Sequence, residues 1–187
     1  MCIRDSVIVG AMANNFLKFN GLNVGASLLE KGTEDIIKSI YSSAEKNNCN
    51  IIIPIDCVVS NDLNGLPKLK SLSEIKSEDI ILDIGEKTIE LINKTIELSK
   101  TVFWNGPAGY FENTNFSKGS LEIAKKISKK NELNEIFSVA GGGDTVASLN
   151  NFGLTNNFNF VSTAGGAFLE FLEGKELPGI KALNYYV

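Results

Sequence analysis

The chain has 187 residues, of which 43% are hydrophobic, enough apolar material for the core of one ordinary domain. Its net charge is −4, and no basic run is longer than a pair such as Lys129-Lys130. The sequence therefore predicts no cationic surface of the kind that binds nucleic acid. Cys2, Cys49 and Cys57 are too few and too irregularly spaced for a disulfide framework. No apolar run approaches the roughly 20 residues that a membrane span needs. We expect a soluble cytoplasmic protein without nucleic-acid or membrane partners.

Two residue types are nearly or wholly missing. Without histidine, a mixed zinc site is excluded, and any chemistry must use carboxylates, backbone amides, lysine or a metal ion. Arg4 is the only arginine among 18 basic residues. Small, multiply charged anions are usually held by arginine, whose planar fork gives bidentate geometry. This chain alone is therefore poorly equipped to hold such a substrate.

Short apolar runs alternate with helical patterns from one end of the chain to the other. Strands are expected at residues 7–10, 50–55, 78–85, 101–104, 136–140 and 158–163. Helices are expected at residues 11–19, 34–46, 86–100, 119–130, 144–150 and 167–173. Segment 58–79 is polar and broken by Gly65 and Pro67, so it is expected to be a loop or small hairpin. The pattern predicts an α/β fold of the doubly wound, Rossmann-like kind, three layers with helices on both faces of a parallel sheet.

The segment "SVAGGGDTVASL", from Ser138 to Leu149, joins a predicted strand to a predicted helix through three glycines. In parallel sheets, ligands bind beyond the carboxyl ends of the strands, where helix N-termini offer free amides to anions. Bare glycines let a phosphate approach, Asp144 could reach a magnesium ion bridging phosphates, and Thr145 could cap the helix or donate its hydroxyl to a phosphate. The alternative is an ordinary tight turn with Asp144 as the N-cap.

Two further junctions have similar features. In "FVSTAGGAFLEFLEG", Gly165 and Gly166 precede a helix expected to begin near Ala167, so a second amide-lined helix start is predicted, with simple helix capping as the alternative. In "TVFWNGPAGYFE", a buried Asn105 beside an exposed Glu112 would suit hydrogen bonds to a ligand such as a sugar. The alternative is a core Trp104, a loop-shaping Pro107 and a solvated Glu112. The patterns GxxxxGK[ST] and GxGxxG are absent, which argues against a P-loop NTPase and a standard dinucleotide dehydrogenase.

Taken together and in order, these segments resemble the C-terminal, nucleotide-binding domain of phosphoglycerate kinase. The resemblance rests on "VGAMANNFLKFNGLNVGASLLE", "PIDCVV", "LDIGEKT", "WNGPAGYFE", "AGGGDTVASL" and "STAGGAFLEFLEGKELPGI". It covers essentially residues 7–183.

The resemblance implies transfer of a phosphoryl group between 1,3-bisphosphoglycerate and Mg·ADP, giving 3-phosphoglycerate and ATP. It implies that Gly143, Gly165 and Gly166 face the transferred phosphoryl group, and that Asp144 is the Mg²⁺ ligand. It assigns the ribose hydroxyls to Glu112. The implied nucleotide-binding residues are Gly10, Ala11, Leu28, Leu82, Asn105, Pro107, Glu112, Gly141, Gly142, Gly143, Asp144 and Thr145. Of these, Gly10, Ala11, Leu28 and Leu82 would line the adenine slot.

The sequence departs from the family pattern in four places. Ala11 and Ala164 stand where the family has glycine, which is tolerable if both have negative φ. We expect residues 1–6 to lie outside the family pattern, as an artefact of gene assembly or a short unrelated leader, and residues 7–187 to form the nucleotide-binding domain. We expect the family's N-terminal domain, which binds phosphoglycerate, to have no counterpart in these 187 residues.

The missing half bears on function. We therefore expect a fragment that binds ADP or ATP but is inactive alone, because transfer needs both domains. The full-length form is expected to be a monomer. A stand-alone or degenerate nucleotide-binding module, and a purely structural domain, remain as alternatives.

Overall fold

The computed structural model describes residues 4–184, in two compact units. The first unit comprises Met1–Leu98 and Pro107–Lys126, and the second comprises Ser99–Gly106 and Ile127–Val187. Residues 1–3 of the expected leader, which include Cys2, lie outside the described residues. The first strand is Asp5–Val7. Cys49 and Cys57 are free thiols.

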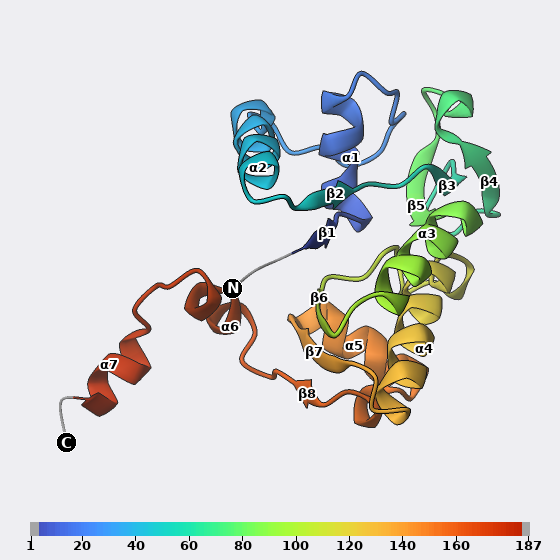
Figure 1. Ribbon diagram of the computed structural model, residues 1–187. Coiled ribbons are helices and arrows are strands. Elements are labelled where there is room, and N and C mark those ends of the chain that lie inside the picture. Colours follow the sequence, from blue (N-terminus) through green and yellow to red (C-terminus); the bar gives the residue numbers. More distant parts are fainter. Residues whose placement is uncertain (1–3, 185–187) are drawn as a thin grey trace. The chain divides into compact units, whose positions relative to one another are not determined.

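The first unit begins with a pair of parallel strands, β1 (Asp5–Val7) and β2 (Asn50–Ile52), which are dark blue and teal in Figure 1. Between them the chain forms α1 (Gly10–Phe19) and α2 (Glu34–Lys46). The apolar residues of α2 recur at helical spacing, and two acids in its first turn and a lysine in its last complement the helix dipole. The helix therefore has the bounds that its sequence pattern predicts.

A second sheet of the first unit is antiparallel. It contains β3 (Asp56–Ser60), β4 (Lys68–Ser71) and β5 (Ile80–Ile84), with β3 in the middle. Strands β3 and β4 form the hairpin expected within segment 58–79, and a short 3₁₀ helix, Leu72–Glu74, follows β4. Strand β5 differs from the expected parallel arrangement, because it pairs with β3 in the opposite direction. The next helix, α3 (Glu86–Glu97), packs on β3.

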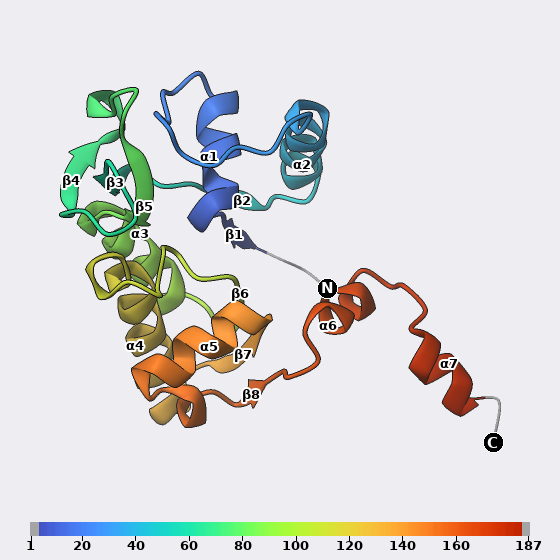
Figure 2. The same cartoon turned by 180° about the vertical axis from the view of Figure 1, so that it is seen from behind.

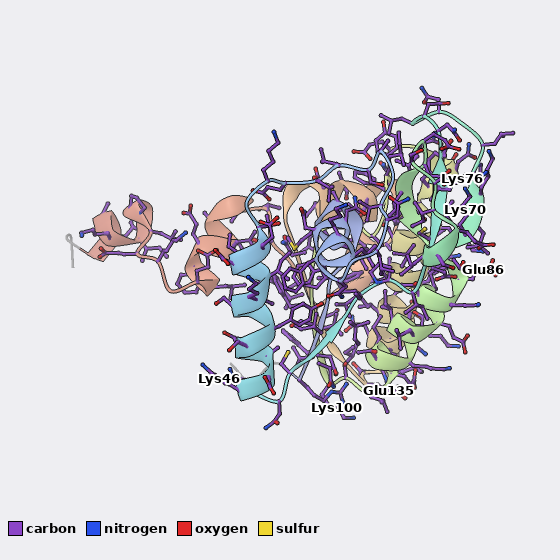
Figure 3. All side chains as sticks on the ribbon, turned by 90° about the horizontal axis from the view of Figure 1, so that it is seen from above. Lys46, Lys70, Lys76, Glu86, Lys100 and Glu135 are labelled. Carbon is purple, nitrogen blue, oxygen red and sulfur yellow. The ribbon has the colours of Figure 1, made fainter. Side chains whose placement is uncertain are left out.

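A partly buried ion pair joins the hairpin to the start of β5. Lys70 Nζ lies 2.6 Å from Asp79 Oδ2, and the Lys76 backbone N–H donates to the same oxygen at 2.7 Å. Figure 3 shows Lys70 and Lys76 close together at this end of the unit. Burial alone would raise the pKa of Asp79, but the hydrogen bonds from Lys70 and the Lys76 amide hold the pKa below its usual value.

The second unit contains a parallel sheet of β6 (Thr101–Asn105), β7 (Phe137–Gly141) and β8 (Phe160–Val161), with β7 in the middle. Helix α5 (Gly143–Phe152) packs along β7, the strand that it follows, as Figure 2 shows. The chain continues through a 3₁₀ helix at Thr155–Asn157, β8, α6 (Gly166–Leu172) and α7 (Pro178–Asn184). Helix α4 (Lys118–Glu132), preceded by the 3₁₀ helix Thr114–Phe116, begins in the first unit and ends in the second.

The α/β class is confirmed, with parallel sheets flanked by helices. All six expected helices are present, and the antiparallel sheet is the main difference from the expected single parallel sheet. Within residues 4–184, no helix combines the length and the apolar character needed to cross a membrane.

Candidate functional site

The predicted site residues fall on both units. Asn105, the 141–145 segment, Gly165 and Gly166 belong to the second unit. The first unit contains the remaining predicted residues, which are Gly10, Ala11, Leu28, Leu82, Pro107 and Glu112.

In the second unit, the carboxyl ends of β6 and β7 lie side by side. Asn105 and Gly141 end these strands and stand opposite each other in the parallel register. Gly142 follows with φ +88°, a conformation that side chains rarely adopt, and a Cβ atom there would lie 2.5 Å from Asn105 Oδ1. Glycine is therefore required at position 142 both by the backbone and by the neighbouring amide side chain.

Helix α5 starts at this turn with its N-terminus open. Gly142 is the N-cap residue, no side chain caps the helix, and Val146 N–H is the first amide to bond back to Gly142. Gly143 is exposed, and a Cβ atom on it would meet nothing within 4 Å. The capping interpretation of Asp144 is wrong, because that residue lies in the first turn, is exposed and makes no cap hydrogen bond. The helix start thus combines free amides, a positive dipole end and one exposed carboxylate.

Thr145 is buried, and its Oγ1 lies close to the glycine turn, 3.6 Å from where a Cβ atom on Gly142 would stand. Its Oγ1 accepts a hydrogen bond from the Gly106 backbone N–H at 2.6 Å, and it has no exposed surface. The predicted helix-capping role of Thr145 is therefore wrong, while its contact with a phosphate stays a prediction. Trp104 holds the same turn from the other side, because its Nε1–H donates to the Gly106 carbonyl at 2.8 Å. The sequence did not predict these two hydrogen bonds. The available signal was Gly106 itself, which follows Asn105 directly in a recognised motif and has φ +99°.

Asn105 was expected to be buried, and this is wrong, because the residue is exposed at the end of β6. Trp104, by contrast, is buried as expected, with its ring near that of Phe158. The inward position of the strand end is taken by the indole, so the next side chain along the strand points outward. An exposed amide beside the glycine turn remains available to a ligand.

The second predicted helix start also follows a strand of this sheet. Gly165 has φ +56° and precedes α6, which begins at Gly166, one residue before the expected start. A Cβ atom on either glycine would meet nothing within 4 Å. Among the described residues only Asn48 and Asn134 have positive φ without being glycine, so Ala11 and Ala164 do not. Both alanine substitutions are therefore compatible with the backbone, as the sequence analysis required.

In the first unit, Gly10 and Pro107 are neighbours. Gly10 starts α1 with φ +63°, and a Cβ atom there would lie 2.8 Å from the Pro107 carbonyl oxygen. Ala11 is exposed in the first turn of α1, and Leu28 is 73% exposed although it is a large apolar side chain. Leu82 is buried in β5, where its carbonyl accepts the Tyr110 N–H at 2.7 Å. An exposed leucine such as Leu28 is available for contact with an apolar ligand.

Glu112 is exposed at the end of the loop that contains Pro107, as expected. Asp83 lies against this loop at Gly109. From the sequence it was noted only as part of "LDIGEKT". Burial raises the pKa of Asp83 to about 7, against the opposing effect of hydrogen bonds from the Gly119 and Ile84 amides. The sequence signal that could have identified Asp83 as a buried acid is its position near the end of an otherwise apolar strand.

No group of three or more acidic or cysteine side chains that could hold a metal ion occurs among residues 4–184. A magnesium ion bound at the α5 turn would therefore have Asp144 as its carboxylate ligand and would need phosphate oxygens and water for the rest of its shell. Mg²⁺ usually binds in this way, through one or two carboxylates and a substrate phosphate. The residues present fit an ion that arrives with a nucleotide.

Comparison with known proteins identifies related chains. A family model described as phosphoglycerate kinase matches residues 3–175, and its match starts within the segment that the sequence analysis set apart. Phosphoglycerate kinase of Zymomonas mobilis is 45% identical over 180 residues, covering 95% of this chain and 45% of the relative. The protein of that name from Rhodopseudomonas palustris is 46% identical over 184 residues, covering 97% of this chain and 46% of the relative.

Solved structures agree with these matches. The structure of phosphoglycerate kinase from Coxiella burnetii has a TM-score of 0.88 and 38% identity, covering 95% of this chain and 46% of that one. The enzyme of that name from Pyrococcus horikoshii gives a TM-score of 0.71 and 30% identity, covering 95% and 44%. The chain thus spans about half the length of the relatives that it matches.

Proposed function

Because the chain belongs to the phosphoglycerate kinase family, we propose that it binds Mg·ADP or Mg·ATP and supplies the nucleotide-binding half of such an enzyme. The observation that carries the proposal is the open start of α5, where Gly142 and Gly143 leave the helix amides uncovered beside exposed Asn105. Helix N-termini of this kind bind phosphate, because the free N–H groups and the dipole both favour an anion.

We assign the phosphates to the second unit. The polyphosphate would lie on the amides of the 141–143 turn, with Asn105 as a side-chain donor. Asp144 would hold the magnesium ion, which when bound neutralises phosphate charge. Thr145 would take part through the turn that it supports, with its hydroxyl hydrogen available for a further contact.

We assign the nucleoside to residues of the first unit. Gly10, Ala11, Leu28 and Leu82 would contact the adenine, of which Leu28 offers the largest exposed apolar side chain. Glu112 is exposed and ionisable, so its carboxylate can accept hydrogen bonds from the ribose hydroxyls. Pro107 would fix the loop that leads to Glu112.

The proposed reaction of the complete enzyme needs no proton transfer. A terminal oxygen of ADP attacks the phosphorus of 1,3-bisphosphoglycerate, the bond from phosphorus to the acyl oxygen breaks, and ATP and a carboxylate result. The nucleophile is the phosphate oxygen in the forward direction and the carboxylate in the reverse direction. Both are already ionised, so no general base is needed and the lack of histidine is no obstacle. Backbone amides of Gly143, Gly165 and Gly166 would stabilise charge on the transferred group.

The bisphosphoglycerate or 3-phosphoglycerate would be bound by the other half of the relatives' length, and the 187 residues alone would be inactive. We further propose a cytoplasmic, monomeric full-length enzyme without nucleic-acid or membrane partners. The composition supports the absence of a nucleic-acid partner, because the chain is acidic overall and has no basic cluster.

Calorimetric titration with Mg·ADP tests the proposal. We expect measurable binding, with loss of Mg·ADP affinity in Asp144→Asn and a much smaller loss for metal-free ADP. Asp35→Asn, which changes an exposed acid of α2, is the matched control. A folded sample that binds no nucleotide at millimolar concentration would refute the proposed function.

A further inference from the structure

Asp83 is a buried carboxylate with no part in the proposed nucleotide contacts. It lies in β5 and is 2% exposed. Its Oδ1 accepts the Ile84 backbone N–H at 2.8 Å, and its Oδ2 accepts the Gly119 N–H at the start of α4, also at 2.8 Å. Each oxygen of the carboxylate therefore has a backbone donor, one from its own strand and one from a helix 36 residues further along the chain.

Two glycines make room for this carboxylate. A Cβ atom on Gly109 would lie 2.5 Å from Asp83 Oδ1, and one on Gly119 would overlap the same oxygen. Neither glycine has positive φ, so their backbone conformations would tolerate a side chain. A side chain at either position would clash with Asp83, and also with the Leu82 carbonyl at Gly109 or the Ile84 side chain at Gly119, so the loop and the helix start pack directly on this part of β5.

The loop that contains Gly109 is tied to the same strand and helix by two further bonds. The Tyr110 N–H donates to the Leu82 carbonyl at 2.7 Å, and the Ala108 N–H donates to Ser120 Oγ at 2.8 Å. Gly109, between these two anchors, rests on Asp83. The segment fixed in this way, residues 107–112, contains Pro107 and Glu112, the two residues of the loop assigned to the nucleotide.

We propose that Asp83 is a positioning residue, which holds the 107–112 loop in the conformation that presents Glu112 to the nucleoside. The proposal rests on the proposed function, because it concerns the same nucleotide. A carboxylate suits the role because both of its oxygens accept hydrogen bonds, whereas an asparagine would turn an NH₂ group toward one of the two backbone N–H donors.

The charge around Asp83 makes the support depend on pH. Lys118, at the start of α4, is the cation that acts on Asp83, and it is itself paired with Glu86 of α3 at 2.7 Å. The other segments packed against Asp83 bring no charge to it. On β3 the residue opposite is Val58, and in the loop the residue in contact is Gly109. Burial places the pKa of Asp83 near 7, so protonation would turn one acceptor oxygen into a donor as the pH falls through neutrality.

The test compares two ligands, Mg·ADP and Mg·pyrophosphate, since only the first has a nucleoside. For Asp83→Asn we expect Mg·ADP affinity to fall about tenfold, as when one buried N–H group loses its acceptor, while Mg·pyrophosphate affinity changes by less than about twofold. Asp35→Asn, an exposed acid-to-amide change, should leave both affinities unchanged. In the unsubstituted chain the ADP-to-pyrophosphate affinity ratio should rise between about pH 6 and 8, and in Asp83→Asn it should stay flat.

Four results separate the possibilities. Equal Mg·ADP affinity and equal pH profiles in the two proteins would overturn the positioning role and leave the proposed function intact. Equal loss for both ligands would also overturn it, because general destabilisation does not discriminate between them. If Asp83→Asn does not fold, a flat affinity ratio in the unsubstituted chain overturns the proposal. If neither ligand binds the folded unsubstituted chain, the proposed function fails. In that case the positioning role is tested by hydrogen exchange of the Tyr110 and Gly119 amides. Equal exchange rates in the unsubstituted chain and in Asp83→Asn would show that Asp83 does not hold the loop.

Discussion

Replacing Asp83 by asparagine should remove a pH dependence from the stability of the protein. The pKa of Asp83 is raised by burial from 3.8 to about 7. Between these values the folded chain keeps a proton on Asp83 that the unfolded chain has lost, so unfolding releases a proton. Stability linked to Asp83 is therefore fully present below about pH 4 and is lost as the pH rises through about 7.

The size of the effect follows from the shift. Each unit of pKa difference corresponds to about 1.4 kcal/mol, so the raised pKa corresponds to up to about 4 kcal/mol lost from the low-pH to the high-pH end of this window. Asparagine carries no charge at any pH and should flatten the difference. Other groups contribute equally to both proteins, and the lowered pKa of Asp79 acts mainly below pH 4.

Urea denaturation followed by circular dichroism, at several values between about pH 4 and 8, measures this difference. The free energy of unfolding of the original chain should decline relative to that of Asp83→Asn as the pH rises. Asp35→Asn serves as the control, since its side chain is 96% exposed. Parallel curves for the original chain and Asp83→Asn would show that Asp83 ionises normally and refute the reasoning.

Three more changes test other parts of the structure. Asp144→Asn should weaken Mg·ADP binding more than tenfold while thermal stability stays the same, and equal loss for metal-free ADP would remove Asp144 from the metal site. Gly142→Ala should destabilise the chain by about 1–3 kcal/mol in thermal denaturation, because of its positive φ and the 2.5 Å approach to Asn105, and Gly143→Ala, in open space, should not. If both alanines behaved alike, the strained turn would be ruled out. Asp56→Ala should cost about 2 kcal/mol or more by leaving the first amides of α3 without an acceptor, and stability equal to the original would contradict this.

The sequence predicted the helices well because each carries its own periodic signal. The Glu34–Lys46 helix has the predicted bounds, since its amphipathic pattern, acidic first turn and basic last turn all agree. The strand expected at residues 50–55 ends at Ile52, because Pro54 follows within the same apolar run. Apolar runs identify strands without setting their exact ends.

The direction of pairing could not be predicted from the same signals. Strand β5 is as apolar as a parallel strand and precedes a helix, yet it pairs antiparallel with β3. The choice depends on where the hairpin of β3 and β4 leaves the chain, a tertiary property that local periodicity does not contain. The junctions with glycine were predicted more reliably, because positive φ at Gly142 and Gly165 is a local requirement.

Burial of individual polar residues was the least predictable feature of the site. Asn105 was expected inside and is exposed, because the neighbouring Trp104 takes the inward place at the end of β6. Thr145 was expected to cap the helix or contact a phosphate; it does not cap α5, because its buried hydroxyl accepts the Gly106 amide, and the phosphate contact stays a prediction. A single sequence does not show which polar side chain will meet such a need.

Five acidic residues of this chain fall into two groups by burial. Asp56, Asp79 and Asp83 are each at most 4% exposed, and each accepts a backbone N–H group, Asp56 from Thr88, Asp79 from Lys76 and Asp83 from Gly119. A buried carboxylate already occupied by such donors has little capacity left for a ligand. Asp144 and Glu112 are exposed, and the described structure gives neither a hydrogen bond. Exposed acids without partners in the chain are the ones free to contact a ligand, as the proposed roles of Asp144 and Glu112 require, whereas the buried acids stabilise backbone segments.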